Sequence, residues 1–173
     1  MMTKPFATTL DPATSLENHT GSWRTLRPVN VFKLPPCNKQ CPAGENIQQW
    51  LYYAAEGDYE HAWRILTEDN PMPACMGRVC YHTCEGKCNR GFLDESVGIN
   101  SVERFLGDYA IEHKLSFKKP VRETGKKVLI IGAGPAGLSA AYHLRRFGHN
   151  VHIVEMAKQP GGMMRYGIPV YRL

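Results

Sequence analysis

The sequence predicts two small units of different fold class: an all-α, cysteine-rich unit, followed by the first β-α-β unit of a parallel α/β sheet. Three observations support this division. All six cysteines lie within the 52 positions from Cys37 to Cys88 of a 173-residue chain. Apolar residues recur at helical spacing between and after these cysteines. Two short apolar runs near the end of the sequence then flank a glycine-rich turn and a helical stretch, which is the order of half a doubly wound fold.

The composition excludes several classes of protein. Hydrophobic residues make up 43% and charged residues 21% of the chain, as in ordinary globular domains and unlike disordered or membrane proteins. No apolar run approaches the roughly 20 residues that span a bilayer, and the first residues lack the apolar core of a secretory signal. The net charge of +5 is mild and its basic residues are scattered. We therefore expect a cytoplasmic protein that binds neither membranes nor nucleic acid.

The first half of the chain predicts an extended arm and a helical hairpin. Residues 1–36 contain five prolines and no sustained apolar period, so we expect an arm without chemistry of its own. Ile47, Trp50, Leu51 and Ala54 then follow helical spacing, and a second such run starts at Tyr59. Gly57 separates the two runs, and Asn70-Pro71 ends the second.

The cysteine-dense segment from Pro71 to Asp94 lacks a clear period, so we expect an irregular backbone held by metal bonds. A helix is predicted to return near Asn100, whose side chain can cap it. Its expected apolar face consists of Ile99, Val102, Phe105, Leu106 and Tyr109.

The last third of the chain predicts a β-α-β unit. Val128–Ile131 is a short apolar run typical of a buried parallel strand, a helix follows from Pro135 to about Phe147, and Val151–Glu155 forms the second strand. The interval from Lys118 to Lys127 has the composition of a linker. We therefore divide the chain into an arm (1–36), a helical domain (37–120) and the start of a dinucleotide-binding domain (121–173).

Gly132-Ala133-Gly134-Pro135-Ala136-Gly137 matches the G-x-G-x-x-G fingerprint and lies between the predicted strand and helix. Gly132 permits the tight turn, Gly134 the approach of a pyrophosphate, and Gly137 close helix–strand packing. We expect the phosphates at the helix N-terminus, beside Pro135 and Ala136. The alternative is a glycine-rich turn that binds nothing.

Two later features bear on the identity of the dinucleotide. Glu155 lies 18 residues beyond Gly137, where its carboxylate can accept ribose hydroxyls and would repel a 2′-phosphate, which disfavours NADP at this site. A second glycine-bearing loop follows at 159–169. Its adjacent Gly161 and Gly162 allow close backbone approach to a ligand, or simply form a loop.

The first cysteine pair resembles part of a ferredoxin motif. Cys37-x-x-x-Cys41-Pro42 has the form of the last two ligands in the bacterial run. Val31 and Leu34 stand where C-x-x-C spacing would place the earlier ligands. A complete ferredoxin run is therefore absent.

Cys80, Cys84 and Cys88 follow at intervals of four residues, which places successive thiolates on roughly one side of a turn and suits a metal cluster. A zinc site is an alternative, although structural zinc favours separated cysteine pairs. Buried free thiols are another. Cys75 lies outside the regular spacing and is a possible non-ligand.

Three histidines are weaker candidates for chemistry. His82 lies between two of the cysteines and is a possible additional ligand. His61 and His143 are each isolated, and we assign them no role.

Six motifs occur in the same order as in a known family. They are Cys37–Pro42, Gly77–Cys80, Cys84–Cys88, Val102–Phe105, the Gly132 fingerprint and Gly161–Pro169. In these motifs the chain resembles the small (beta) subunit of NADPH-dependent glutamate synthase and its relatives, which include the N-terminal part of dihydropyrimidine dehydrogenase and the large subunit of ferredoxin:NADP transhydrogenase.

The resemblance implies a helical domain with [4Fe-4S] clusters, followed by FAD- and NAD(P)H-binding domains. One cluster of the family takes three cysteines and a carboxylate or amide, here Cys41, Cys80, Cys84 and Glu103. Without the resemblance, Glu103 would be taken for an exposed helix residue. The other cluster takes an upstream cysteine pair with residues that match Cys37 and Cys88. Since that pair is missing, we expect one cluster, and a second only if Cys75 or a partner protein completes it. The motif at Gly161–Pro169 adds Gly162 and Arg165 to the expected cofactor-binding residues.

The implied function is that of an NAD(P)H-dependent iron–sulfur flavoprotein oxidoreductase, which passes electrons between FAD and the cluster and exchanges them with a partner subunit. No catalytic acid or base is expected. The sequence stops inside the first FAD segment, so we expect a longer polypeptide or a separate subunit to supply the remaining FAD and NAD(P)H domains. The alternatives are a non-catalytic docking module stabilised by zinc or a cluster, with an unused nucleotide site, and a redox sensor.

Overall fold

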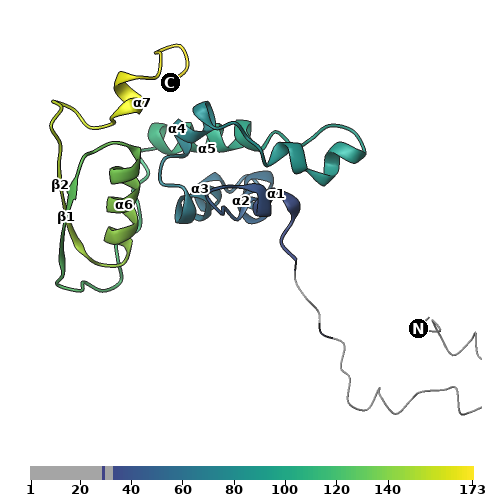
Figure 1. Ribbon diagram of the computed structural model, residues 1–173. Helices are drawn as coiled ribbons and strands as arrows, with labels where there is room; N and C mark the ends of the chain where they lie inside the picture. The colour runs from purple at the N-terminus through teal and green to yellow at the C-terminus, as the bar shows by residue number, and fades with distance from the viewer. Residues whose placement is uncertain (1–28, 30–32) are drawn as a thin grey trace, which may run out of the picture. The chain divides into compact units, whose positions relative to one another are not determined.

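The computed structural model describes Val29 and residues 33–173. Every element below lies in the unit Leu34–Leu173 (Figure 1). Nearly all of the predicted arm therefore lies outside the described residues. None of the helices in the described part has the length and apolarity needed to cross a membrane.

The cysteine-rich region folds as short helices (Figure 1). The predicted hairpin is confirmed by two helices that pack against each other. Gly57 joins them with a φ of 80°, and the Asp58 carboxylate caps the second helix by accepting the His61 N–H at 3.1 Å. The elements are α1 (Pro36–Gln40), α2 (Ile47–Ala55), α3 (Tyr59–Asp69), α4 (Pro73–Val79), α5 (Ile99–Glu112) and the 3-10 turns η4 (Glu85–Lys87) and η5 (Asn89–Phe92).

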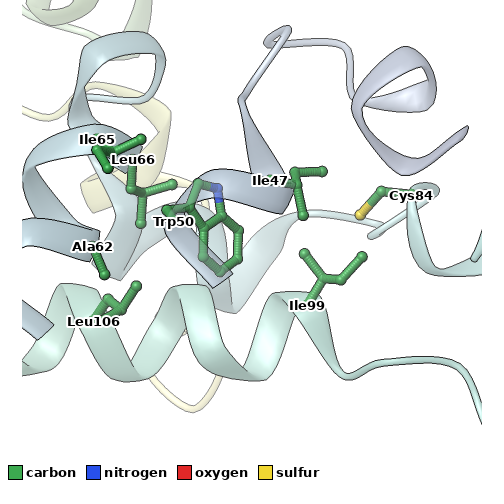
Figure 2. Packing of buried hydrophobic residues seen from close by; sticks show 8 residues of the cluster. All are labelled: Ile47, Trp50, Ala62, Ile65, Leu66, Cys84, Ile99 and Leu106. Carbon is green, nitrogen blue, oxygen red and sulfur yellow. The ribbon is translucent and has the colours of Figure 1, made fainter. Parts of the chain in front are cut away.

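A single apolar core joins α2, α3 and α5 (Figure 2). Ile47, Trp50, Leu66 and Leu106 are its fully buried large side chains. Each contributes roughly 1.5–3 kcal/mol through removal of apolar surface from water. Cys84 belongs to the same core cluster, so apolar packing places one predicted ligand at the edge of a rigid core.

The prediction of an irregular backbone from Pro71 to Asp94 is partly wrong, because residues 73–79 form α4. Pro73 occupies the first turn, where its missing N–H costs nothing. Cys80 is the C-terminal cap, and its N–H donates to the Met76 carbonyl at 2.8 Å. The helix ends on a cysteine that the sequence singles out.

Helix α4 packs on α5 at backbone distance because two glycines remove the side chains that would separate them. A Cβ on Gly107 would lie 2.2 Å from the Ala74 nitrogen, and one on Gly77 would lie 2.5 Å from the Arg104 Cα. This contact fixes the position of Cys80 relative to α5.

The predicted capping role of Asn100 is also wrong. Helix α5 begins at Ile99, with Gly98 as its N-cap and no capping side chain from that residue. Asn100 lies inside the first turn, where its N–H donates to the Glu85 carboxylate at 2.8 Å. A carboxylate from η4 therefore satisfies a free amide at the helix start, which joins the cysteine-rich turn to α5. The expected apolar face is correct at Ile99 and Leu106, whereas Phe105 is exposed.

The last part of the chain confirms the order β, α, β. Strand β1 (Lys127–Ile131) and strand β2 (Asn150–Val154) are parallel, with Lys127 opposite Asn150 and Ile131 opposite Val154, and α6 (Pro135–Arg146) connects them (Figure 1). A short helix α7 (Met163–Tyr166) follows.

Helix α6 covers one face of this two-stranded sheet. Val128 and Ile130 lie on the partly buried positions of β1, whereas Leu129 and Ile131 are 60% and 85% exposed. The strand is therefore buried on one face, instead of on both as predicted from its apolar run. Among the described residues, no second layer packs on the other face.

Helix α6 also packs on the end of α3. The Tyr142 hydroxyl donates to the Thr67 carbonyl at 2.5 Å, and the Arg146 guanidinium donates to the Glu68 carbonyl. The Phe117 ring joins the two helices, stacking on Trp63 with centroids 5.3 Å apart and meeting Tyr142 edge-on at 4.7 Å. These contacts place α6 beside the end of α3.

Candidate functional site

Four of the predicted metal-binding residues line one cavity of about 310 Å³. Cys41 follows α1, Cys80 caps α4, Cys84 precedes η4, and Glu103 comes from α5. Side chains from four separate segments thus converge, although the spacing of the cysteines alone does not determine which of them meet. The rest of the wall is largely apolar and includes Ile47, Pro71, Met72, Met76 and Ile99.

The thiols of this cavity lie close enough to oppose each other's ionisation. The pKa of Cys84 is raised to about 12, first by burial, then by the negative charge of Cys41, with a smaller contribution from Cys80. Burial also raises the pKa of Cys41. Bound metal cations would remove this penalty by compensating the thiolate charges. The His82 N–H already donates to the Cys80 sulfur at 3.3 Å.

Glu103 is a buried carboxylate, not an exposed helix residue. It is 6% exposed, and one of its oxygens accepts from the Asn70 amide at 2.8 Å. Burial and the neighbouring Glu45 carboxylate raise the pKa of Glu103 to about 8. No cation among the described residues pairs with it. A carboxylate so placed suits a metal ligand, because a bound cation would compensate its charge.

Sequence reasoning missed Glu45 and Asn70, which both belong to this site. Glu45 lines the cavity, is 5% exposed, and accepts from the Asn70 amide at 3.0 Å. Burial raises the pKa of Glu45. The Trp50 indole N–H lies near enough to lower that pKa, yet it makes no hydrogen bond within the described residues. The only local signal at these positions is the Asn70-Pro71 pair, which predicts the end of a helix and no ligand.

The other three cysteines do not line the cavity. Cys37 lies in α1, which packs beside the η4 turn that Cys88 ends. The pKa of Cys88 is lowered, chiefly by the Val97 N–H. Cys75 lies within α4, and burial raises its pKa. All six cysteines are free thiols.

The three histidines differ in position. His82 lines the cavity, with a φ of 41°, and its ring nitrogen lies 3.7 Å from the Glu85 carboxylate. His61 stacks on Tyr53 with ring centroids 4.0 Å apart. His143 lies in α6. Only His82 remains near the cysteines.

The cavity suits a cluster better than a single ion. Within the part of the chain that the structure describes, no group of three or more His, Cys, Asp or Glu side chains could hold a metal ion as it stands. Zinc requires four ligands about 2.0–2.3 Å from one point. Here three thiols and a carboxylate are among the residues that line a space of about 310 Å³, which is larger than one metal ion needs.

The dinucleotide fingerprint has the geometry expected of it. Gly132 has a φ of 99°, and Gly134 is the N-cap of α6, with Pro135 in the first turn. A Cβ on Gly137 would lie 2.0 Å from the Gly132 oxygen. The turn therefore requires glycine at its first and last positions. Ala136 is exposed in the first turn of the helix.

Glu155 lies directly after β2 and contacts the fingerprint loop. Its two oxygens accept from the Ala133 N–H at 2.5 Å and from the Ala157 N–H at 2.8 Å. These bonds, Ala157 first, lower the pKa of Glu155. The carboxylate is therefore ionised and fixed at the carboxyl end of the sheet, where parallel α/β folds bind their ligands.

The second glycine loop packs on the fingerprint loop. The Gly161 N–H donates to the Ala133 carbonyl at 2.8 Å. Gly162 has a φ of 51°, and a Cβ there would lie 2.8 Å from the Gly134 Cα. The adjacent glycines thus bring two backbones together. Arg165 donates to the Pro160 carbonyl at 3.0 Å, which closes the loop on itself.

Helix α6 borders both regions. Its N-terminus carries the fingerprint, and Pro135 and Ser139 from its first turns line the cysteine cavity. One helix therefore forms part of the dinucleotide loop and part of the cavity wall.

Two family models match this chain, one over the cysteine-rich helices and one over the dinucleotide fingerprint. Residues 15–115 match the family model for dihydropyrimidine dehydrogenase domain II, 4Fe-4S cluster. Residues 130–167 match that of the NAD(P)-binding Rossmann-like domain.

Individual relatives cover most of this chain. The beta subunit of NADP(+)-dependent formate dehydrogenase from Moorella thermoacetica is 38% identical over 82% of this chain and 23% of its own length. The small chain of NADPH glutamate synthase from Azospirillum brasilense is 38% identical over 81% of this chain and 30% of its own length. The NAD-dependent dihydropyrimidine dehydrogenase subunit PreT homolog from Salmonella typhi is 35% identical over 80% of this chain and 34% of its own length.

The chain thus spans about a third or less of the length of these relatives. The first family model covers more than half of the 173 residues. This chain belongs to the dihydropyrimidine dehydrogenase domain II, 4Fe-4S cluster family.

Proposed function

We propose that this member of the dihydropyrimidine dehydrogenase domain II family acts within an NAD(P)H-dependent iron–sulfur flavoprotein oxidoreductase, where it passes electrons between FAD and one [4Fe-4S] cluster. The observation that carries the proposal is the position of α6. Its N-terminus carries the fingerprint loop, and the same turns line the cavity that contains three thiols and a buried carboxylate. Two cofactor regions that share a helix suit electron transfer.

In this proposal Cys41, Cys80, Cys84 and Glu103 hold the cluster, which supplies a one-electron carrier when bound. The largely apolar wall lowers the polarity around the cluster, and burial is one of the factors that set the potential of such a group. The chain needs no proton donor or acceptor for this task. Its side chains bind and orient the cofactors.

The proposed dinucleotide is FAD. Gly132, Gly134 and Gly137 admit its pyrophosphate to the N-terminus of α6, and Glu155 accepts ribose hydroxyls. Ala136, Pro135, Gly162 and Arg165 complete the loops around it. The relatives are named for NAD, NADP or NADPH, so we assign the nicotinamide cofactor to a further domain of the complete enzyme.

The proposed domains are the helical domain from 37 to 120 and the start of the FAD domain from 121 to 173. This boundary is supported by the stretch between the end of α5 at Glu112 and the start of β1 at Lys127, which contains no helix or strand. The relatives are described as subunits or a small chain. We therefore propose that a partner subunit exchanges electrons with the cluster.

Anaerobic reconstitution with iron and sulfide tests the cluster assignment. The wild-type chain is expected to take up about four iron atoms and to show an electron paramagnetic resonance (EPR) signal after reduction, as one [4Fe-4S] cluster requires. Cys84→Ser is expected to abolish the signal. Cys75→Ser is the matched control, since Cys75 is a partly buried thiol outside the cavity and its loss should leave the iron content unchanged.

Three outcomes would contradict the proposal. Stoichiometric zinc in place of iron would favour the docking module. Equal loss of iron in the Cys75 and Cys84 variants would show that the cavity does not select the ligands. Copurification of the complete enzyme without FAD would overturn the flavin assignment.

A further inference from the structure

One buried amide connects the two carboxylates of the cavity. The Asn70 Nδ2 group donates to Glu45 Oε1 at 3.0 Å and to Glu103 Oε1 at 2.8 Å. Asn70 is 4% exposed, so water does not compete for these bonds. Both hydrogens of the amide are therefore used on carboxylates that come from different segments of the chain.

The orientation of this amide is fixed by its other end. Asn70 Oδ1 accepts the Met72 N–H at 3.1 Å. A flipped amide would place its oxygen against two carboxylates and its NH₂ group against an N–H, so only one orientation satisfies all three neighbours. Glu45 accepts the second hydrogen of the amide and so fixes the orientation of the amide plane.

The two oxygens of the Glu103 carboxylate have different surroundings. Oε1 accepts from Asn70 at 2.8 Å. The Asn100 side chain lies near enough to lower the pKa of Glu103, yet its amide donates to the Met76 carbonyl at 3.4 Å. Trp50 Nε1 is the only fully buried side-chain nitrogen or oxygen in the described part that lacks a partner, so Glu103 Oε2 is not sealed inside the protein. Since Glu103 lines the cavity, this oxygen remains available to a ligand there.

We propose that Asn70 is a positioning residue, which holds Glu103 by one oxygen and so presents the other to an iron atom of the cluster, with Glu45 as the second anchor of the amide. This inference rests on the proposed function. Groups that hold a metal ligand in place typically change metal affinity 10- to 100-fold when they are lost. The iron bound by Glu103 would be the one affected.

The test compares Asn70→Leu in two backgrounds of the full chain, reconstituted anaerobically with iron and sulfide. In the wild-type background, we expect Asn70→Leu to weaken retention of one iron roughly 10- to 100-fold against a chelator and to yield a three-iron EPR signal on oxidation. In a Glu103→Cys background, a fourth thiolate replaces the carboxylate and needs no amide to orient it. There Asn70→Leu should leave iron retention unchanged.

Thr67→Val is the matched control, because Thr67 is another buried polar residue near the end of α3 and its hydroxyl donates to the Trp63 and Arg64 carbonyls, not to either carboxylate. It should keep all of the iron. Asn70→Ser, whose hydroxyl cannot donate to both carboxylates, should behave as Asn70→Leu does and guards against a fault specific to leucine. Circular dichroism reports the helix content of each variant.

The results separate the possible failures. Equal iron loss in both backgrounds would show that Asn70 serves only the fold and would overturn its positioning role. Unchanged iron retention in the wild-type background would overturn it as well. A wild-type chain that took up no cluster would instead refute the proposed function.

Discussion

Replacement of Gly107 by alanine tests whether the contact between α4 and α5 positions Cys80 in the cavity wall. The added Cβ would lie 2.2 Å from the Ala74 nitrogen and 2.5 Å from the Ala74 Cα. Both are backbone atoms, so no side-chain rotation relieves the clash. An ordinary contact starts at 3.4 Å, so α4 must move by about 1.2 Å, the difference between 3.4 and 2.2 Å. Cys80, at the end of α4, would move with it.

Two opposing effects determine how much Gly107→Ala changes the free energy of unfolding. Alanine is favoured over glycine within a helix by about 1 kcal/mol, whereas overpacking of a tight contact costs about 1–3 kcal/mol. Because the clash is with backbone, we expect the upper part of that range and a net destabilisation of about 1–2 kcal/mol. The displacement should also lower the iron content after reconstitution.

Urea unfolding of the metal-free chain measures the first effect, as a lower midpoint at constant slope. Gly86→Ala is the control, since Gly86 lies between Cys84 and Cys88 and a Cβ there meets nothing within 4 Å. It should leave stability and iron content unchanged. A Gly107→Ala chain with the wild-type midpoint and full iron content would refute the argument that the glycine contact positions Cys80.

Three further predictions follow from individual contacts. The pKa of Glu103 is raised to about 8 in the fold, so the folded metal-free chain binds this proton more tightly than the unfolded chain. The free energy of unfolding should therefore fall as the pH rises from about 4.5 to 8. Glu103→Gln should flatten that dependence in urea unfolding. Asp108→Asn removes a bidentate ion pair with Arg78, at 2.7 and 2.9 Å. Because both side chains are partly exposed, the loss of unfolding free energy should be at most about 1 kcal/mol. The same measurement in 1 M salt is the control. Gly162→Ala adds a Cβ 2.8 Å from the Gly134 Cα, so amide hydrogen exchange in residues 159–167 should accelerate, whereas unchanged protection there would contradict the packing of the two loops.

The helices that the sequence predicted are those whose signals are local. Helices α2 and α3 carry their own apolar period, and Gly57 and Asn70 end them. Helix α4 was missed because its seven residues lack such a stripe. It is held instead by the glycine contacts with α5, which join Gly107 to Ala74 and Gly77 to Arg104, 33 and 27 positions apart, and leave no local period.

The candidate site divides in the same way. Family motifs pointed to Cys41, Cys80, Cys84 and Glu103, and these residues do line one cavity. No motif indicated that Glu45 and Asn70 would join them, since a buried carboxylate and a helix-ending asparagine have no pattern of their own. Their role arises from tertiary burial, where an amide with two hydrogens is the means of keeping two carboxylates satisfied.

The end of α3 connects the two halves of the proposed function. Its last turn presents the Thr67 and Glu68 carbonyls to Tyr142 and Arg146 of α6. The next residue after the helix, Asn70, holds the two carboxylates of the cavity. A shift of this turn would therefore act on the wall that carries the dinucleotide loop and on the proposed cluster ligand at the same time. The packing of α3 into the core, through the fully buried Leu66, holds this turn in place for both regions. Stability and cofactor binding should therefore change together when that core is weakened.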